Sequence, residues 1–128
     1  FLTYDHKAEP ADAISTVAAL HHLPDFWKLV ALRRLASMLK PDGRLFLFDV
    51  VFSFDIREHK RRIERFIAKT RQQMGPNGQS ESEAHVREEY STCDWIMEGL
   101  LEKAGFRIQT SDYHDEFLAS YLCMKKSR

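Results

Sequence analysis

The sequence predicts an α/β fold with a mostly parallel sheet closed by an antiparallel last strand, in a single domain over residues 1–128. Two observations carry this prediction. Between Asp12 and Phe52 a strand, an amphipathic helix and a second strand follow one another, which indicates parallel pairing with a right-handed crossover. Near the C-terminus two further apolar runs are separated by a short polar joint, which favours an antiparallel pair.

The first strand and helix of this unit follow from hydrophobic spacing. Phe1–Tyr4 is a short β-type run, and Asp12–Ala19 is the nearly continuous apolar run of a strand covered on both faces. Pro24 discourages helix before it, so Asp25 is expected to be the N-cap of the next helix. Apolar residues at helical spacing then predict a helix over Phe26–Leu39.

The middle of the chain contains the strongest strand signal and then an insertion. Lys40-Pro41-Asp42-Gly43 predicts a turn, and Arg44–Phe52, rich in Phe and Val, predicts a strand. A basic helical segment over Ile56–Met74 follows, and Gly75-Pro76-Asn77-Gly78 should break it before the acidic run Glu81–Glu89.

The last third predicts one helix and two strands. Ser91-Thr92-Cys93-Asp94 resembles a capping box that opens a helix over Cys93–Ala104, which Gly105 ends. Phe106–Thr110 and Phe117–Met124 predict the antiparallel strand pair. The two tryptophans, Trp27 and Trp95, are expected to pack in the core.

Composition excludes several classes of protein. Hydrophobic residues make up 44% of the 128 positions and charged residues 30%, which is typical of a globular domain. Lys+Arg and Asp+Glu both number 19, so no overall field favours nucleic acid or an anionic membrane. No apolar run reaches the roughly 20 residues that span a bilayer, and no leader is visible. Two separate cysteines, Cys93 and Cys123, favour a reduced, cytoplasmic protein over a disulfide scaffold.

Three segments resemble, in order, the motifs of class I S-adenosylmethionine-dependent methyltransferases. Asp12–Asp25 (DAISTVAALHHLPD) is similar to the fourth-strand motif of that family. Leu35–Asp49 (LASMLKPDGRLFLFD) resembles the helix, L-K-P-G-G turn and fifth strand, with Asp42 where Gly is usual. Leu100–Phe106 (LLEKAGF) resembles the start of the sixth strand. The chain therefore resembles the C-terminal half of such an enzyme.

This resemblance implies a Rossmann-like sheet of order 3-2-1-4-5-7-6. The chain would supply strands 4-5-7-6 and a helical insertion over about residues 54–90, and Phe1–Tyr4 would correspond to the third strand. In this family a Gly-rich loop after the first strand and an acidic residue after the second hold the cofactor. The five glycines here are scattered, and neither element is found. A complete enzyme is therefore expected to need residues N-terminal to Phe1.

The resemblance also implies where cofactor and substrate would bind. At that site the chemistry of a His base makes His21 the candidate catalytic residue for an acidic acceptor, and the positions of His22 and Asp49 make them candidate substrate contacts. Contacts to S-adenosylmethionine are implied at six positions: Asp5, Ser15, Thr16, Ala18, Leu20 and His21.

Each of these residues also has a plain structural interpretation. His21 and His22 could shape the loop and cap the next helix, and Asp49 could hydrogen-bond a loop backbone. No His or Cys has the spacing of metal ligands, so no metal site is expected. The basic helix Arg57–Arg71 could bind an anionic partner or simply face solvent. Because no aromatic residues are interleaved there to stack bases, nucleic acid is disfavoured.

The sequence is compatible with two functions. The first is methyl transfer from S-adenosylmethionine to a small-molecule acceptor. The second is a non-catalytic, self-associating or partner-completed fragment. Without strands one and two, Asp12–Ala18 would be an apolar edge strand, which tends to pair with another chain. That edge is expected to be covered by a second copy, as a homodimer, or by Phe1–Tyr4.

Overall fold

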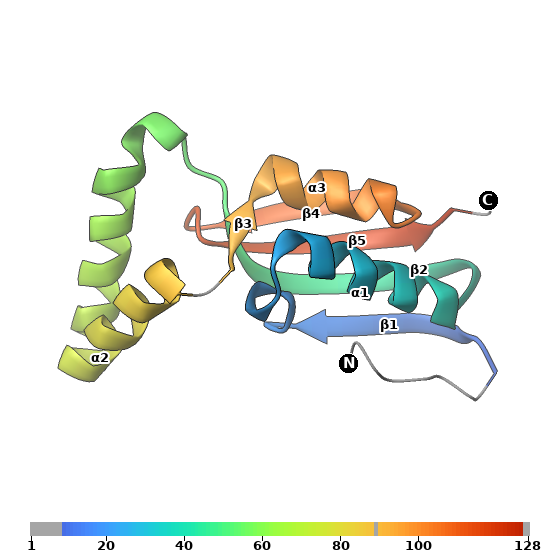
Figure 1. The fold of residues 1–128 in the computed structure, drawn as a ribbon, viewed down its shortest axis with the longest axis horizontal. Coiled ribbons are helices and arrows are strands. Elements are labelled where there is room, and N and C mark those ends of the chain that lie inside the picture. The colour runs from blue at the N-terminus through green and yellow to red at the C-terminus, as the bar shows by residue number, and fades with distance from the viewer. Residues whose placement is uncertain (1–8, 89, 127–128) are drawn as a thin grey trace.

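The computed structural model describes residues 9–88 and 90–126, without the side chains of residues 74 and 76–88. Phe1–Tyr4 and Asp5 lie outside the described residues. The elements, shown in Figure 1, are β1 (Ala11–Val17), the 3₁₀ turn η1 (Leu20–His22), α1 (Asp25–Met38), β2 (Leu39–Phe52), the 3₁₀ turn η2 (Ile56–Glu58), α2 (His59–Glu88), β3 (Thr92–Cys93), α3 (Asp94–Lys103), β4 (Phe106–His114) and β5 (Leu118–Lys125).

The strands form a mixed sheet in the order β1-β2-β5-β4, with the short β3 beside the end of β2. β1 pairs with β2 in parallel, and β5 runs antiparallel to both β2 and β4. This confirms the predicted α/β class and the predicted order of fourth, fifth, seventh and sixth strands. Among the described residues β1 pairs only with β2, so its outer side is an edge of the sheet.

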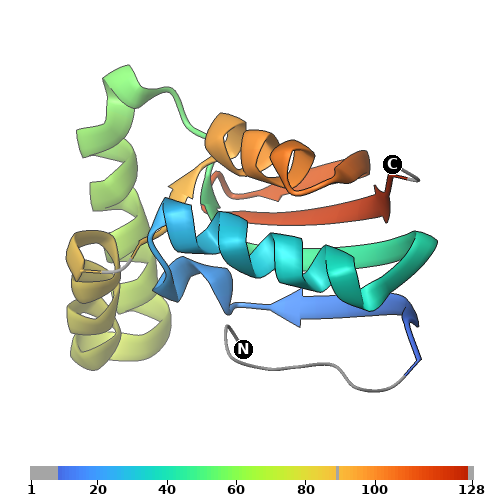
Figure 2. The same cartoon turned by 45° about the vertical axis from the view of Figure 1, so that its right-hand side comes forward.

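Helices α1 and α3 cover the same face of the sheet, as Figures 1 and 2 both show. Successive strand residues point to opposite faces, so alternate residues of β2 enter the core beneath these helices. Leu45, Leu47 and Val51 are fully buried there, together with Phe106 of β4 and Tyr121 of β5. No helix in the described part of the chain covers the opposite face in the same way, and Phe46 on that face is 43% exposed.

The expectation that the first strand is covered on both faces is wrong. Only Thr16 of β1 is buried, and Val17 is 61% exposed. The reason is its position: within the described residues β1 lies at the edge of the sheet, and α1 and α3 cover one face only.

Both predicted helix caps are also wrong. Pro24 is the N-cap of α1, no side chain caps that helix, and Asp25 is its first helical residue. The predicted capping box is extended instead, because Thr92 and Cys93 form β3 and pair with the end of β2. Gly105, however, follows α3 with a φ of 104°, in the left-handed conformation expected after a helix.

The tryptophans do not pack in the core. Trp27 is 47% exposed and Trp95 is 72% exposed. The residues of α1 and α3 that face the sheet are smaller, among them Ala31, Leu35 and Leu101. Apolar spacing therefore identified the helices but not the side of each helix that is covered.

The turn predicted at residues 40–43 lies within β2, where the pairing with β1 is irregular. Ala11 pairs with Leu39 and Ala13 pairs with Arg44, so β2 has extra residues between these two pairs. Asp42 adopts a left-handed φ of 62°. At Gly43 an added Cβ would lie only 2.9 Å from the Lys40 carbonyl oxygen, so the close approach of the backbone requires glycine there.

The insertion projects beyond the carboxyl end of β2 (Figure 1). It consists of η2 and α2, and its helix is interrupted at Gly75, where φ is 76° and ψ is −165°. This confirms the predicted break. No helix within the described residues is long and apolar enough to cross a membrane.

Candidate active site

The loop after β1 begins with a strained residue. Ala18 has a φ of 54°, and its N–H donates to the Phe48 carbonyl oxygen at 2.8 Å. A left-handed conformation costs a residue with a Cβ roughly 1–2 kcal/mol. The chain then forms η1 at the carboxyl ends of β1 and β2, which is where ligands bind in open α/β sheets. This observed strain supports a functional interpretation of the loop.

Asp49 organises this loop from within the core. Its side chain is almost fully buried, with an exposed fraction of 1% for the residue. The carboxylate accepts hydrogen bonds from the Leu20 N–H at 2.8 Å and from the Val50 N–H at 2.8 Å. The structure therefore confirms the structural interpretation of Asp49, in which its side chain hydrogen-bonds a loop backbone.

His21 is the third group held by Asp49. Its Nδ1 lies 2.7 Å from Asp49 Oδ1, and the residue is buried, with 7% exposed. When Asp49 is ionised its carboxylate only accepts, and Nδ1 is then the donor of this hydrogen bond. In the neutral ring this leaves Nε2 as the basic nitrogen, an arrangement that acid–base catalysis uses. His22 is exposed, and its ring centroid lies 4.1 Å from that of His21.

Lys28 joins the loop to the end of the insertion. Its buried ammonium donates to the Leu23 carbonyl at 2.5 Å, to Asp25 Oδ1 at 3.2 Å and to the carbonyl of Tyr90. The Tyr90 N–H in turn donates to the His21 carbonyl at 2.8 Å. Burial lowers the pKa of Lys28, and the hydrogen bond to Asp25 opposes that shift.

Sequence reasoning missed this lysine. Two of its three partners are backbone carbonyls, which no side-chain pattern reveals. The one available signal was Asp25, three residues earlier and one turn away along the helix.

The other predicted site residues divide by burial. Ser15 and Ala18 are exposed, whereas Thr16 and Leu20 are buried. Asp5 lies outside the described residues. Leu20, His21 and Asp49 are brought together by hydrogen bonds. Within the described residues, no group of three or more His, Cys, Asp or Glu side chains could hold a metal ion.

Known proteins share this arrangement of strands and helices. No family model matches the chain. An uncharacterized methyltransferase of Geobacillus kaustophilus is 30% identical over 106 residues, which are 83% of this chain and 45% of the relative. Human N-acetylserotonin methyltransferase, solved with S-adenosylmethionine, matches with a TM-score of 0.64 and 17% identity, over 98% of this chain and 32% of that one. The chain has part of a methyltransferase fold.

A second solved methyltransferase gives the same result. An O-methyltransferase family 2 protein from Planctomyces limnophilus, solved with apigenin, matches with a TM-score of 0.63 and 15% identity, over 98% of this chain and 33% of that one. The resemblance predicted from the three motifs is confirmed. The chain spans less than half the length of the curated relative and about a third of each of these two solved structures. In the methyltransferase fold, Asp49 and His21 lie at the ends of the fifth and fourth strands.

Proposed function

We propose that this chain forms the base-bearing part of an S-adenosylmethionine-dependent methyltransferase that acts on a small-molecule acceptor. The observation that carries the proposal is the buried Asp49–His21 pair at the carboxyl ends of the parallel strands. The methyltransferase fold supports it, because the pair lies where that fold class binds ligands.

The proposed chemistry assigns one task to each residue. When bound, S-adenosylmethionine supplies a methyl group made reactive by the sulfonium. His21 Nε2 accepts the proton that the acceptor's hydroxyl or amine loses as its new bond to the methyl group forms. Asp49 keeps the Nδ1 proton in place and stabilises the resulting imidazolium, while His22 lies beside it as a substrate contact.

The residues at the end of β1 fit part of such a cofactor. Val17 is 61% exposed, and the neighbouring Ser15 and Ala18 are exposed and small, so the strand's backbone and one apolar side chain are accessible. An adenosyl group needs this combination of apolar surface and backbone polar groups. The structure describes no Asp5, so a role for that residue in cofactor binding stays a prediction.

The test is an NMR titration of the ¹⁵N-labelled chain with S-adenosylhomocysteine up to millimolar concentration. We expect weak binding that shifts the backbone amides of Ser15, Thr16, Ala18, Leu20 and His21, while the amide of the exposed Lys60 on α2 stays unchanged. NMR suits weak binding, because a ligand must reach about 100 times its dissociation constant to stabilise a protein by about 2.7 kcal/mol. Unchanged amides along the end of β1 would contradict the proposal.

The base role of His21 has its own test. In any form of the protein that transfers methyl groups, His21→Gln should lower the rate by about a hundredfold or more, whereas His22→Gln, next to it and exposed, should cost less. Equal losses from both substitutions would show that His21 has no special part in proton transfer.

The second candidate is a non-catalytic fragment that associates with a copy of itself or with a partner. The observation that favours it is the edge of β1, which pairs with nothing on its outer side within the described residues. A homodimer through this edge predicts slow amide exchange along residues 14–17 and a concentration-dependent mass in analytical ultracentrifugation. A monomer with fast exchange there argues against it.

We also propose that the protein acts in a reducing, cytoplasmic compartment. Cys93 and Cys123 are both free thiols, which is the usual state in such a compartment. Intact mass of the native protein after alkylation of free thiols tests this, with two alkyl groups expected.

A further inference from the structure

A cavity of about 540 Å³ lies between α2, the β4–β5 turn and the end of β2. Sites for small molecules commonly have volumes of roughly 300–1,000 Å³, so this cavity fits an organic molecule rather than a single ion. Val50 lines it, and Val50 follows Asp49 directly. Because successive strand residues point to opposite faces, the cavity and the Asp49–His21 pair lie on opposite sides of the same strand end.

Two aromatic rings, Phe66 and Phe117, line the cavity, and Phe52 and Phe54 pack against Phe117. The rings of Phe66 on α2 and Phe117 after the β4–β5 turn are stacked, with centroids 4.4 Å apart and planes 20° apart. Phe52 packs edge-on against Phe117 at 5.6 Å, and Phe54 lies 5.5 Å from Phe117. Phe117 is itself 8% exposed and therefore held in place. A planar ring can extend such a stack at little entropic cost.

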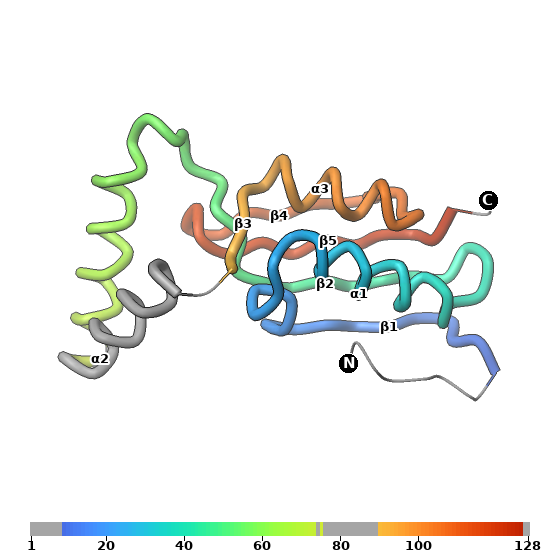
Figure 3. The backbone as a smooth tube through the Cα atoms, viewed as in Figure 1, coloured from blue at the N-terminus to red at the C-terminus, as the bar shows by residue number. Residues whose placement is uncertain are grey.

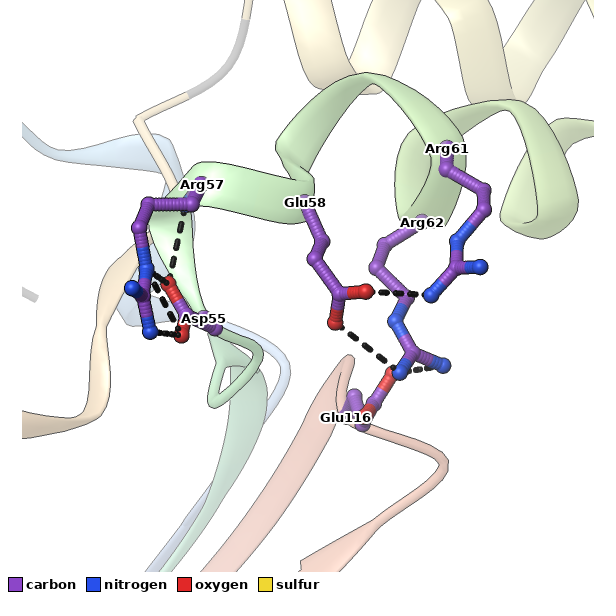
Figure 4. A network of polar contacts seen from close by, with 6 residues as sticks. All are labelled: Asp55, Arg57, Glu58, Arg61, Arg62 and Glu116. Atoms are coloured by element: carbon purple, nitrogen blue, oxygen red, sulfur yellow. Dashed lines mark hydrogen bonds and ion pairs between the residues drawn. The ribbon is translucent and has the colours of Figure 1, made fainter.

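The rim of the cavity is charged, and its acids are already paired. Lys69 Nζ lies 2.7 Å from Asp115 Oδ2, and the hydrogen bond from Lys69 lowers the pKa of Asp115. Arg62 binds Glu116 at 3.3 Å and also Glu58 at 3.2 Å, as Figure 4 shows. These ion pairs tie α2 to the turn between β4 and β5, where Asp115 and Glu116 both have left-handed φ angles, of 54° and 65°.

One lining cation takes no part in these pairs. Among residues whose side chains the structure describes, Arg65 has no hydrogen-bonded ion pair, although it lines the cavity beside Phe66 and its charge also acts on Asp115. A guanidinium is a rigid donor fork that matches a carboxylate in a bidentate manner. The cavity thus combines two stacked aromatic rings with a cation available to an anionic group.

We propose that this cavity binds a planar aromatic molecule with one carboxylate, its ring against Phe66 and Phe117 and its carboxylate on Arg65. The proposal does not make this acid the methyl acceptor, because the cavity and the His21 base lie on opposite sides of the strand end. The insertion supplies half of the residues that line the cavity, and its far end is fixed to the His21 loop through Tyr90. A ligand there contacts the segment that is tied to the candidate base.

The test compares two matched probes, 2-naphthoate and its neutral amide 2-naphthamide, by calorimetric titration of the chain without cofactor. We expect 2-naphthoate to bind about tenfold more tightly, because only the acid forms a charge-assisted pair with Arg65. Arg65→Gln should abolish this preference. Arg71→Gln, which removes the same charge from an exposed position of the same helix, should keep it.

A second variant tests the stacked aromatic rings. Phe66→Leu keeps an apolar residue of similar size and loses the stack, so both probes should bind several-fold more weakly with an unchanged circular dichroism spectrum. Equal affinities for the two probes, no binding at millimolar concentration, or equal effects of Arg65→Gln and Arg71→Gln would overturn the proposal.

The two proposals fail separately. S-adenosylhomocysteine shifts at the end of β1 without 2-naphthoate binding would overturn the aromatic-acid proposal and leave the methyltransferase proposal in place. Binding of 2-naphthoate with the Arg65 dependence, but no response to S-adenosylhomocysteine, would support the cavity as an aromatic-acid site and count against the methyltransferase proposal.

Discussion

The two faces of β2 have similar residues and very different surroundings. Leu45 and Leu47 point under α1 and α3 and are fully buried, whereas Phe46 between them is 43% exposed on the other face. Both faces are apolar enough to need a cover. An apolar strand face must be covered by another element, but the strand's own sequence does not show which element covers it. The covered face also tolerates one carboxylate, Asp49, because hydrogen bonds satisfy it.

The largest predicted difference is between neighbouring residues of this strand. Leu47→Ala should lower the free energy of unfolding by about 3 kcal/mol, because it leaves a cavity in the core. Phe46→Ala should cost about 1 kcal/mol or less, because that side chain already contacts water. Urea denaturation measures both. If Phe46→Ala is as costly as Leu47→Ala, and increasingly so at higher protein concentration, a second copy covers the face in solution.

The next effect concerns the charge on the covered face. Asp49→Asn should cost about 2 kcal/mol, because an amide cannot accept all three hydrogen bonds and leaves a buried donor unsatisfied. Its control is Asp12→Asn, which removes only an exposed pair with Lys40 and should change stability by less than about 0.5 kcal/mol. If the two substitutions lower the free energy of unfolding equally, the hydrogen bonds of Asp49 stabilise the fold no more than an exposed ion pair does.

A smaller effect should follow at the buried lysine. Lys28→Met keeps the packing of the stem but leaves the carbonyls of Leu23 and Tyr90 without their donor, so we expect a loss of about 1 kcal/mol and faster amide exchange at Tyr90. Lys60→Met, at an exposed position of α2, serves as the control. A more stable Lys28→Met protein would show that desolvation of the ammonium outweighs its hydrogen bonds.

The smallest effect is in the pH dependence of stability. Burial raises the pKa of the Cys123 thiol from its usual value of 9.0 to about 12. Between these values the unfolded chain loses a proton that the folded chain keeps, so stability falls as the pH rises. From about pH 8 to about pH 9.5, Cys123→Ala should remove less than about 1 kcal/mol of this decline. An unchanged decline, measured by denaturation at both pH values, would contradict the assignment.

The strand order was predictable because three motifs carry it in sequence order. Local patterns also located the helices, the break at Gly75 and the turn at Gly105. The errors share a physical cause. Whether Ser91–Asp94 caps a helix or extends as a strand depends on pairing with Val51 and Phe52, which lie about forty residues earlier. The spacing of residue types within a short segment gives no information about pairing with such a distant strand.

The sequence predicted which residues form the candidate site but not the hydrogen bonds between them. His21 and Asp49 were identified by resemblance, and their contact depends on the register of β1 against β2, where Val17 pairs with Phe48. A shift of one residue would turn Asp49 away from the loop. Lys28 could not be assigned to the site, because its partners there are backbone carbonyls.

The two ends of the insertion are held at neighbouring points of the sheet. Figure 3 traces the backbone from the end of β2 into α2 and from β3 onward into α3, and β3 pairs directly with Val51 and Phe52. A segment fixed at both ends can change in length and sequence without disturbing the elements that hold it. Changes of length or sequence within this segment leave the sheet pairing of β2 and β3 in place. Such changes would keep the geometry of Asp49 and His21 only if the backbone hydrogen bond from Tyr90 to the His21 loop is kept.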